Sequence, residues 1–292
     1  MKRVLALILA LLLLLPFGPA ARAEEAQESR VVLGADLTNE QIDTVYRAFG
    51  VSRGSVTELQ VTNAEERRYL EGYVEEAVIG TLSISSVYVQ LLAEGDGMHV
   101  STSNISWCTG EMYRSALATA GIKDARIVVA APFAVSGTAA LTGIYKAYED
   151  MTGQELSDQA KDAGTQELTV TGQLAEEIGG ADTASIVSEL KGMLSETAQM
   201  SDEELEKTIG QIAEQYRVSL SQKQVQQLVG LCRALEGLDP SALQKRVEDV
   251  QNTLQKVSEA KDQVLSFADK MQRLYQAVAG FFSNLRDIFG GE

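Results

Sequence analysis

The chain has little of several residue types that catalytic, metal and nucleic-acid sites require. It contains one histidine and two cysteines among 292 residues. With His99 as the single histidine, a Ser–His or Cys–His nucleophile has only one residue to draw on. Basic residues are also scarce, because 25 Lys and Arg stand against 41 Asp and Glu, which gives a net charge of −16. This acidic balance argues against binding nucleic acid or an anionic membrane, since both need basic patches.

The scarcity of cysteine and histidine also limits disulfides and metals. Cys108 and Cys232 both lie in apolar stretches of the sequence. In an exported chain they have the option of one long-range disulfide, but buried free thiols suit such surroundings as well, and we predict that they do not pair. A zinc site would have to be built from cysteines or carboxylates around one histidine, and no D-x-D-x-D-G calcium loop occurs. We therefore predict no metal and no cofactor.

Apolar runs long enough to span a membrane are absent after residue 23. The first 23 residues, MKRVLALILALLLLLPFGPAARA, place two basic residues before an unbroken apolar run, and they end in a small-residue A-x-A motif. This layout is typical of a secretory signal peptide, and an uncleaved anchor is the alternative. We predict a signal peptide over residues 1–23, and a mature protein that has no transmembrane segment and is secreted or associated with the cell envelope.

Residues 31–153 combine strand and helix signals. DLTNEQIDTVYRAFG is an amphipathic helix pattern in which Thr38 and Gln41 have capping-box spacing. Residues from Ile84 to Ile105 alternate apolar and polar on both sides of EGDG, which predicts a β-hairpin. The helix pattern GEMYRSALATAG follows, and then ARIVVAAP, whose continuous apolar run predicts a strand buried on both faces. A further helix follows this strand, and the segment is predicted to be an α+β domain.

Strand signals nearly vanish beyond residue 153, and residues 154–238 are predicted to be helical. Ser201 with Glu204 and Ser221 with Gln224 have capping-box spacing at the starts of two of the helices. The predicted helices are 157–179, 183–196, 201–217 and 221–237. The fold class predicted for the whole chain is therefore α+β, with an all-helical carboxyl-terminal half.

Residues 239–290 carry a strong heptad pattern that predicts one long, coiled-coil-like amphipathic helix. Only Lys261 interrupts its apolar seam. Something must cover this seam. The preceding helices of the chain, a second copy in a homo-oligomer and an envelope protein partner are the alternatives, and contact of the aromatic carboxyl-terminal end with a membrane surface is a further one. One series of seam positions is Leu243, Val250, Val257, Val264, Met271, Val278 and Leu285.

Two sequence motifs, GVSRG and SELK, match catalytic patterns only by their letters. GVSRG at residues 50–54 matches the G-x-S-x-G nucleophile elbow, but a helix pattern precedes it and an extended segment follows, which inverts the context that the elbow needs. SELK at residues 188–191 matches S-x-x-K without the partner motifs, so Ser188 is interpreted as a residue on the surface of a helix. His99 is interpreted as an ordinary strand side chain.

Ser136 stands where a predicted strand gives way to a predicted helix, in IVVAAPFAVSGTAALTGIYKAYE (residues 127–149). Its hydroxyl would serve as a helix cap, which is the interpretation that the sequence favours. Alternatively, Ser136 and the backbone N–H groups of Gly137 and Thr138 form a site for an anion or another ligand at the helix start. A role as a nucleophile would need a base, which only His99, a lysine or a carboxylate can supply.

Several segments together resemble one protein family: VVLGADLTNEQ, VTNAEERRYL, IGTLSISSVYV and NISWCTGEMYRSALATAGIKDARIVVAAPFAVSGTAALTGIYKAYE. This is the predicted secreted family of Gram-positive bacteria catalogued as domain of unknown function 1002. The resemblance runs from residue 31 to near the carboxyl terminus, and residues 104–149 are its most specific part. It implies export and a bacterial source. It implies no activity, cofactor or residue role, because the family name carries none.

These observations predict a non-catalytic exported protein that works at or near the bacterial cell envelope through protein or ligand contacts. The alternative is an envelope hydrolase, or an anion- or ligand-binding domain, with its site at the helix that starts beside Ser136. A pocket beside residues 133–138 would favour the alternative.

Overall fold

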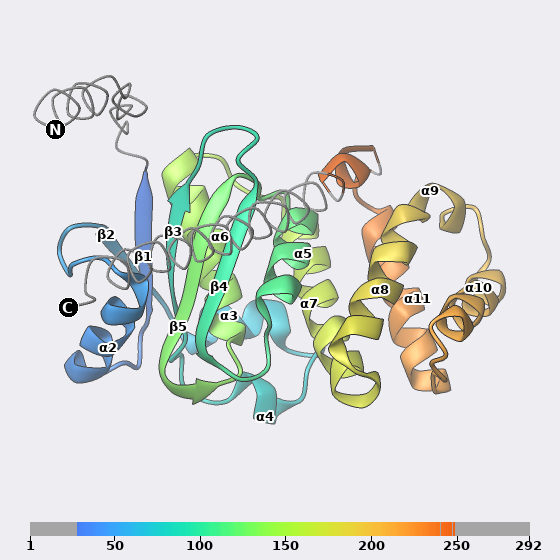
Figure 1. Cartoon of the computed structure of the whole chain (residues 1–292), viewed down its shortest axis with the longest axis horizontal. Coiled ribbons are helices and arrows are strands. Elements are labelled where there is room, and N and C mark those ends of the chain that lie inside the picture. Colours follow the sequence, from blue (N-terminus) through green and yellow to red (C-terminus); the bar gives the residue numbers. More distant parts are fainter. Residues whose placement is uncertain (1–27, 240, 247, 249–292) are drawn as a thin grey trace, which may run out of the picture.

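A mixed five-stranded β-sheet forms the amino-terminal half of the computed structural model, which describes residues 28–239, 241–246 and 248 (Figure 1). The strand order is β2-β1-β3-β5-β4. The pairs β1–β2 and β4–β5 are parallel, and β1–β3 and β3–β5 are antiparallel. A helical region follows the sheet, so the predicted α+β class is confirmed. The strands are β1 (Ser29–Gly34), β2 (Thr57–Val61), β3 (Ser86–Leu91), β4 (Met98–Ile105) and β5 (Ala125–Val135).

The β-hairpin predicted between residues 84 and 105 is wrong. Both of its strands form, but they do not pair with each other, because β5 lies between them. Ile127 of β5 is opposite Val89 on one side and Val100 on the other. Ile127 is fully buried, and Val128, whose side chain points to the opposite face, is 8% exposed. The predicted burial of β5 on both faces is thus confirmed, and this burial favours an interior position for β5, between β3 and β4.

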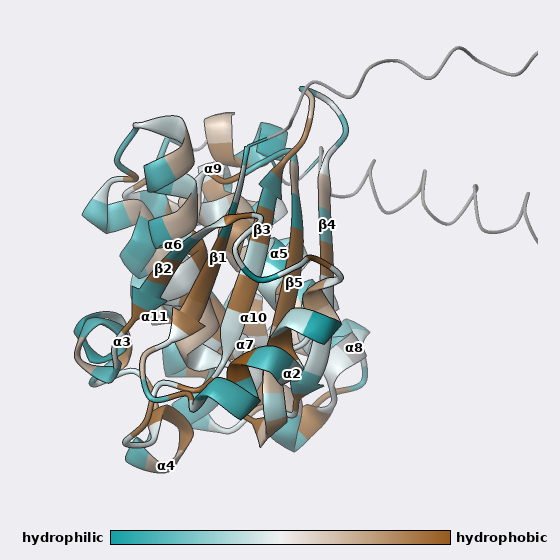
Figure 2. Cartoon of the chain, turned by 90° about the vertical axis from the view of Figure 1, so that its left-hand side faces the viewer, coloured by the Kyte–Doolittle hydropathy of each residue, from teal (hydrophilic) through white to brown (hydrophobic). Residues whose placement is uncertain are grey.

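The two faces of the sheet are covered by different helices. α5 and α6 pack on one face, where Val87, Val89 and Ile127 belong to the largest apolar core. α2 packs on the other face, against β3 and β5, and Figure 2 shows the apolar strands in brown behind it. The helices of this half are α2 (Asn39–Phe49), α3 (Asn63–Leu70), α4 (Glu76–Ile79), α5 (Gly110–Ala120) and α6 (Thr138–Thr152).

The carboxyl-terminal half of the described chain is helical, as predicted. One predicted helix, 183–196, is in fact two, because the backbone leaves helical geometry at Met193 (φ −106°, ψ 13°). The capping boxes that begin at Ser201 and Ser221 are both present. α7 joins the two halves, since it packs against α5 as well as against α8 and α11. The helices are α7 (Asp158–Ile178), α8 (Gly180–Gly192), α9 (Leu194–Thr197), α10 (Asp202–Gln215) and α11 (Gln222–Glu236).

Both cysteines are free and buried, as predicted. Cys108 belongs to the core beneath the sheet, whereas Cys232 belongs to the core of the helical half. Burial raises the pKa of both thiols to about 12. The two side chains therefore serve as apolar packing in separate cores.

Two predicted segments lie largely outside the described residues. The predicted signal peptide, residues 1–23, is one of them, and the predicted heptad helix beyond residue 248, with Lys261, is the other. The first residue of the heptad series, Leu243, is described and is fully buried in the core of the helical half. Among the described residues, no helix has both the length and the apolar character needed to cross a bilayer.

Candidate functional site

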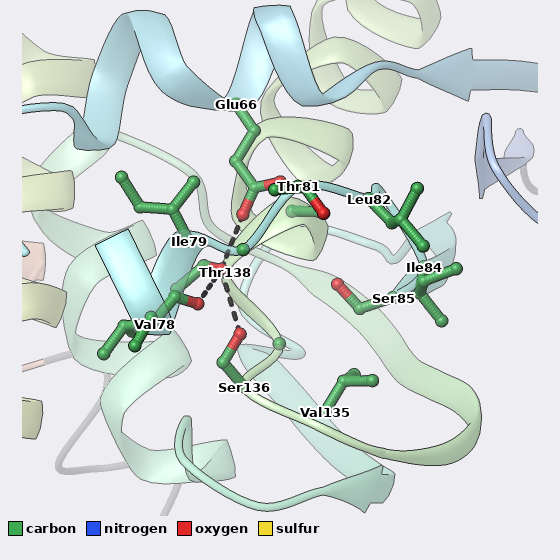
Figure 3. A pocket seen from close by; sticks show the side chains of 14 residues that line it. Glu66, Val78, Ile79, Thr81, Leu82, Ile84, Ser85, Val135, Ser136 and Thr138 are labelled. Carbon is green, nitrogen blue, oxygen red and sulfur yellow. Dashed lines mark hydrogen bonds between the residues drawn. The ribbon is translucent and has the colours of Figure 1, made fainter. Parts of the chain in front are cut away.

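A pocket of about 300 Å³ opens beside Ser136 (Figure 3). It lies between the beginning of α6 on one side and α4 with the segment that follows it on the other. Ser136, Gly137 and Thr138, which the sequence analysis singled out, all line it. The opposite wall comes from residues 77–82, and Glu66 of α3 contributes a carboxyl group. The structure therefore brings the predicted residues together with one acidic side chain that sequence analysis missed.

Ser136 does not cap α6, so the interpretation that the sequence favoured is wrong. The N-cap residue is Gly137, which has no side chain of its own to cap the helix, and the Oγ atom of Ser85 accepts from the amide of Ala140 instead. Gly137 has φ +100°, and a Cβ there would lie 2.6 Å from the hydroxyl oxygen of Tyr113. Glycine is thus required for both conformational and steric reasons. The hydroxyl of Ser136 lies 3.1 Å from Thr138 Oγ1 instead.

Three side chains form a hydrogen-bonded chain along the wall of the pocket. Thr138 Oγ1 lies between the hydroxyl of Ser136 and the carboxyl of Glu66, to which it donates at 2.6 Å. Asn63 also donates to Glu66, at 3.4 Å. Glu66 and Thr138 are each 1% exposed, whereas Ser136 is half-buried. Figure 3 shows Glu66 pointing from α3 to Thr138, so the chain leads from a buried carboxyl to a hydroxyl at the pocket.

The pKa of Glu66 is unusually high for a carboxylic acid. Burial raises its pKa from 4.5 to about 7, although the hydrogen bonds from Thr138 and Asn63 and the charge of Arg67 act in the opposite direction. Arg67 is occupied elsewhere, since its guanidinium makes two hydrogen bonds to Glu76, at 2.7 and 3.0 Å. Glu66 therefore changes its charge close to neutral pH.

The backbone at the start of α6 adds hydrogen-bond donors. Among the described residues, the amides of Thr138 and Ala139 have no acceptor, whereas the amide of Ala140 donates to Ser85 Oγ at 3.0 Å. Thr138 and Ala139 are both buried, and buried amides are nearly always paired with protein, water or ligand. The dipole of α6 adds partial positive charge at this end. The pocket is therefore suited to an oxygen acceptor, and an anionic one in particular.

Comparison with known proteins adds the family. A family model described as "Protein of unknown function (DUF1002)" matches residues 33–257. The chain belongs to the DUF1002 family. It is 34% identical to "Uncharacterized protein YpuA" of Bacillus subtilis (strain 168) over 290 residues, which cover 98% of this chain and 97% of that relative. No solved structure matches the chain. The resemblance on which the sequence analysis relied is therefore confirmed.

The remaining sequence motifs lie away from the pocket of this DUF1002 protein. His99 is exposed on β4 and pairs in register with Arg126, whereas Ile105, at the other end of β4, pairs with Val135 beside the pocket. No Ser–His pair with Ser136 is therefore formed. GVSRG follows α2 and precedes β2, as predicted, which is the inverse of a nucleophile elbow.

Lys191, the lysine of the SELK motif, takes part in a buried ion pair. Lys191 is 3% exposed and donates to both carboxylate oxygens of Glu167, at 2.9 and 3.0 Å. This ion pair joins α8 to α7. Lys191 is therefore the ion-pair partner of a carboxylate, and Ser188 is a half-buried residue of α8. No group of three or more His, Cys, Asp or Glu residues suited to hold a metal occurs in the described part of the chain.

Glu66 was not predicted as a site residue, because nothing in the local sequence distinguishes it. It lies in NAEERRYL, where it is one of two adjacent glutamates in a polar run. The only signal is its spacing of four residues from Leu70, which places both on one face of α3. Leu70 is 1% exposed, so this face is the buried one. In retrospect, the i, i+4 relation to an apolar residue was evidence for a buried carboxyl.

Proposed function

We propose that this DUF1002 protein is an exported, non-catalytic binding protein of the bacterial cell envelope. Its ligand is a small molecule with a carboxylate or a similar oxygen anion, which binds in the pocket beside Ser136. The observation that supports this most is the Ser136–Thr138–Glu66 chain, which ends at a pocket next to two buried amides that have no acceptor among the described residues. The pattern of residues 1–23 supports export.

The hydrogen-bonded chain links the charge of Glu66 to the donor capacity of Ser136. When Glu66 is ionised, Thr138 donates to it, and the Ser136 hydroxyl can donate to Thr138. When Glu66 is protonated, its own hydroxyl donates to Thr138, which can then donate to Ser136. The Ser136 hydrogen is now free for a ligand, and the negative charge beside the pocket is gone. An anion therefore binds best to the protonated form.

Binding fits this geometry better than hydrolysis does. A serine nucleophile needs a base within hydrogen-bond reach. The side-chain partner of Ser136 is the hydroxyl of Thr138, and Glu66, the nearest carboxyl in this chain of contacts, lies beyond it. Thr138 touches Glu66 directly, but its hydroxyl is already enclosed by Glu66, Ser136 and the backbone carbonyl of Val78, at 2.6, 3.1 and 3.5 Å.

Ligand binding is tested with acetate and sulfate, because neither anion titrates between pH 6 and 8. In isotopically labelled protein, the amide resonances of Thr138 and Ala139 are expected to shift saturably with added anion. If only the protonated form of Glu66 binds, a pKa of about 7 makes the apparent affinity about tenfold higher at pH 6 than at pH 8. Glu66→Gln, which cannot ionise, is expected to remove this pH dependence.

Ser136→Ala is expected to weaken binding roughly tenfold or more, since it removes one hydrogen bond to a charged group. Ser52→Ala is the matched control, because Ser52 is an exposed serine in the loop between α2 and β2. The proposal fails if neither anion shifts the two amides. It also fails if Glu66→Gln keeps the pH dependence of the parent protein.

Export is tested separately, by expressing the full chain in a Gram-positive host and fractionating the culture. The protein is expected in the medium or with the envelope, with an amino terminus at Glu24. Recovery of the uncleaved chain from the cytoplasm would contradict export, while leaving the binding proposal to its own test.

A further inference from the structure

We infer that a second cleft, at the junction of the two halves of the chain, is a binding site for a neutral saccharide. The cleft has a volume of about 400 Å³. Its walls are the helices α7 and α11 and the turn that follows α3. It adjoins the Ser136 pocket, with which it shares Val78. Its polar side chains are different ones, however, and the inference does not depend on the function proposed above. Ligand sites occur preferentially at junctions of this kind.

Two aromatic side chains form part of the cleft. Trp107 is held rigidly, because its indole N–H donates to Glu176 at 2.9 Å and its ring lies against Gly172, where a Cβ would overlap the indole. Tyr73 is 41% exposed, which is unusual for so large a side chain. Aromatic rings of this kind offer apolar faces at little cost in conformational entropy. The C–H faces of a sugar ring are the complementary surface.

Two amides are fixed in orientation beside these rings. Gln173 Nε2 donates to the backbone carbonyl of Tyr73 at 2.9 Å, and Gln227 Nε2 donates to Gln173 Oε1. This arrangement sets which end of each amide is donor and which is acceptor. Among the described residues the side-chain oxygen of Gln227 has no donor. Pre-oriented donors and acceptors of this kind suit sugar hydroxyl groups and lower the entropic cost of binding them.

The charges of the cleft argue against an anionic ligand. Glu75, Glu176 and Glu177 line it together with a single base, Lys223, so an anion is repelled. Two of the carboxylates already have donors, since Glu176 accepts from Trp107 and Glu177 accepts from Gln224 at 2.7 Å. Lys223 offsets one of the three negative charges, and the test below includes a cation as the competing ligand. A neutral ligand rich in hydroxyl groups fits the remaining donors and acceptors.

The chain provides its own reporter, because Trp107 is its only tryptophan. The full chain is titrated with maltotriose, cellotriose and chitotriose, and tryptophan emission is recorded. At least one trisaccharide is expected to change the emission saturably. Tyr73→Ala is expected to weaken that binding at least tenfold, and truncating so exposed a side chain should not impair folding, which circular dichroism checks.

Two control variants make the test specific. Phe133→Ala removes an aromatic side chain that is 50% exposed and lies outside the cleft, and it should leave the titration unchanged. Ser136→Ala should also leave it unchanged, which separates this site from the proposed anion pocket. The inference is overturned if none of the three sugars gives a saturable change, if Tyr73→Ala binds as tightly as the parent protein, or if the cation spermidine saturates the response and the sugars do not.

Discussion

Replacing Lys191 by methionine is expected to destabilise the protein strongly. Lys191 and Glu167 are 3% and 1% exposed, and they connect α8 to α7 at the place where α7 packs on α5. The ammonium group also donates to the hydroxyl of Ser115 at 3.1 Å. Glu167 in turn accepts from Ser115 and from Thr119. Each partner of the ion pair is thus hydrogen-bonded to hydroxyl groups as well as to the opposite charge.

The expected cost follows from leaving Glu167 buried without its counter-ion. Removal of one partner of a buried ion pair typically costs about 3–5 kcal/mol. This is a large fraction of the roughly 5–15 kcal/mol by which a domain is stable. Glu167→Gln is expected to cost a similar amount, because it leaves Lys191 as an isolated buried cation. In the double variant no net charge is buried, and the glutamine still accepts hydrogen bonds from Ser115 and Thr119.

The assay is urea unfolding, followed by circular dichroism, of the parent, the two single variants and the double variant. We expect the double variant to be more stable than the sum of the single effects predicts, by at least about 2 kcal/mol. Lys146→Met is the matched control. Its pair with Glu65 is partly exposed, at 39% and 36%, and exposed pairs contribute at most about 1 kcal/mol. A loss below about 1 kcal/mol for Lys191→Met, or additive single effects, would refute the reasoning.

Two further predictions concern pH and thiol chemistry. The pKa of Glu66 is about 7 in the folded protein, whereas its ordinary value is 4.5, so between these values the native state binds a proton that the unfolded state has lost. The free energy of unfolding is therefore expected to fall as pH rises from about 5 to 8, by roughly 3 kcal/mol at most. Glu66→Gln should remove this slope in urea unfolding at several pH values, and an unchanged slope would contradict the raised pKa. Cys108 and Cys232 are buried, and their pKa values are about 12. A thiol reagent at pH 8 should therefore modify both only after unfolding. Rapid labelling of the native protein would contradict this prediction, because it would mean that the two cores open to solvent.

The positions of the helices were largely predictable because their boundaries depend on local interactions. In the capping boxes at Thr38, Ser201 and Ser221, one side chain binds a backbone N–H three residues away, and all three are present. The spacing is visible in the sequence, and its energetic effect needs no distant partner. The same reasoning failed at Ser136, where Gly137 took the cap position.

The pairing of the strands was not predictable from the turn between them. EGDG does separate β3 from β4, but a turn signal says only that the chain reverses direction. β5 follows β4 only after α5, so the local turn signal carries no information about it. Its apolar run must be buried on both faces. It meets this need by pairing with both β3 and β4, and so burial outweighed the local hairpin.

The sequence by itself determined the α+β class, the free cysteines, most helix starts and the position of residues 136–138 between a strand and a helix. The tertiary structure alone decided that β5 separates β3 from β4, and that Glu66, 72 residues before Thr138, completes the pocket wall. The physical reason is the range of the interactions. Caps and amphipathic faces depend on residues within one or two turns of each other. The raised pKa of Glu66, in contrast, comes from the burial that arises when α3 and α6 pack together.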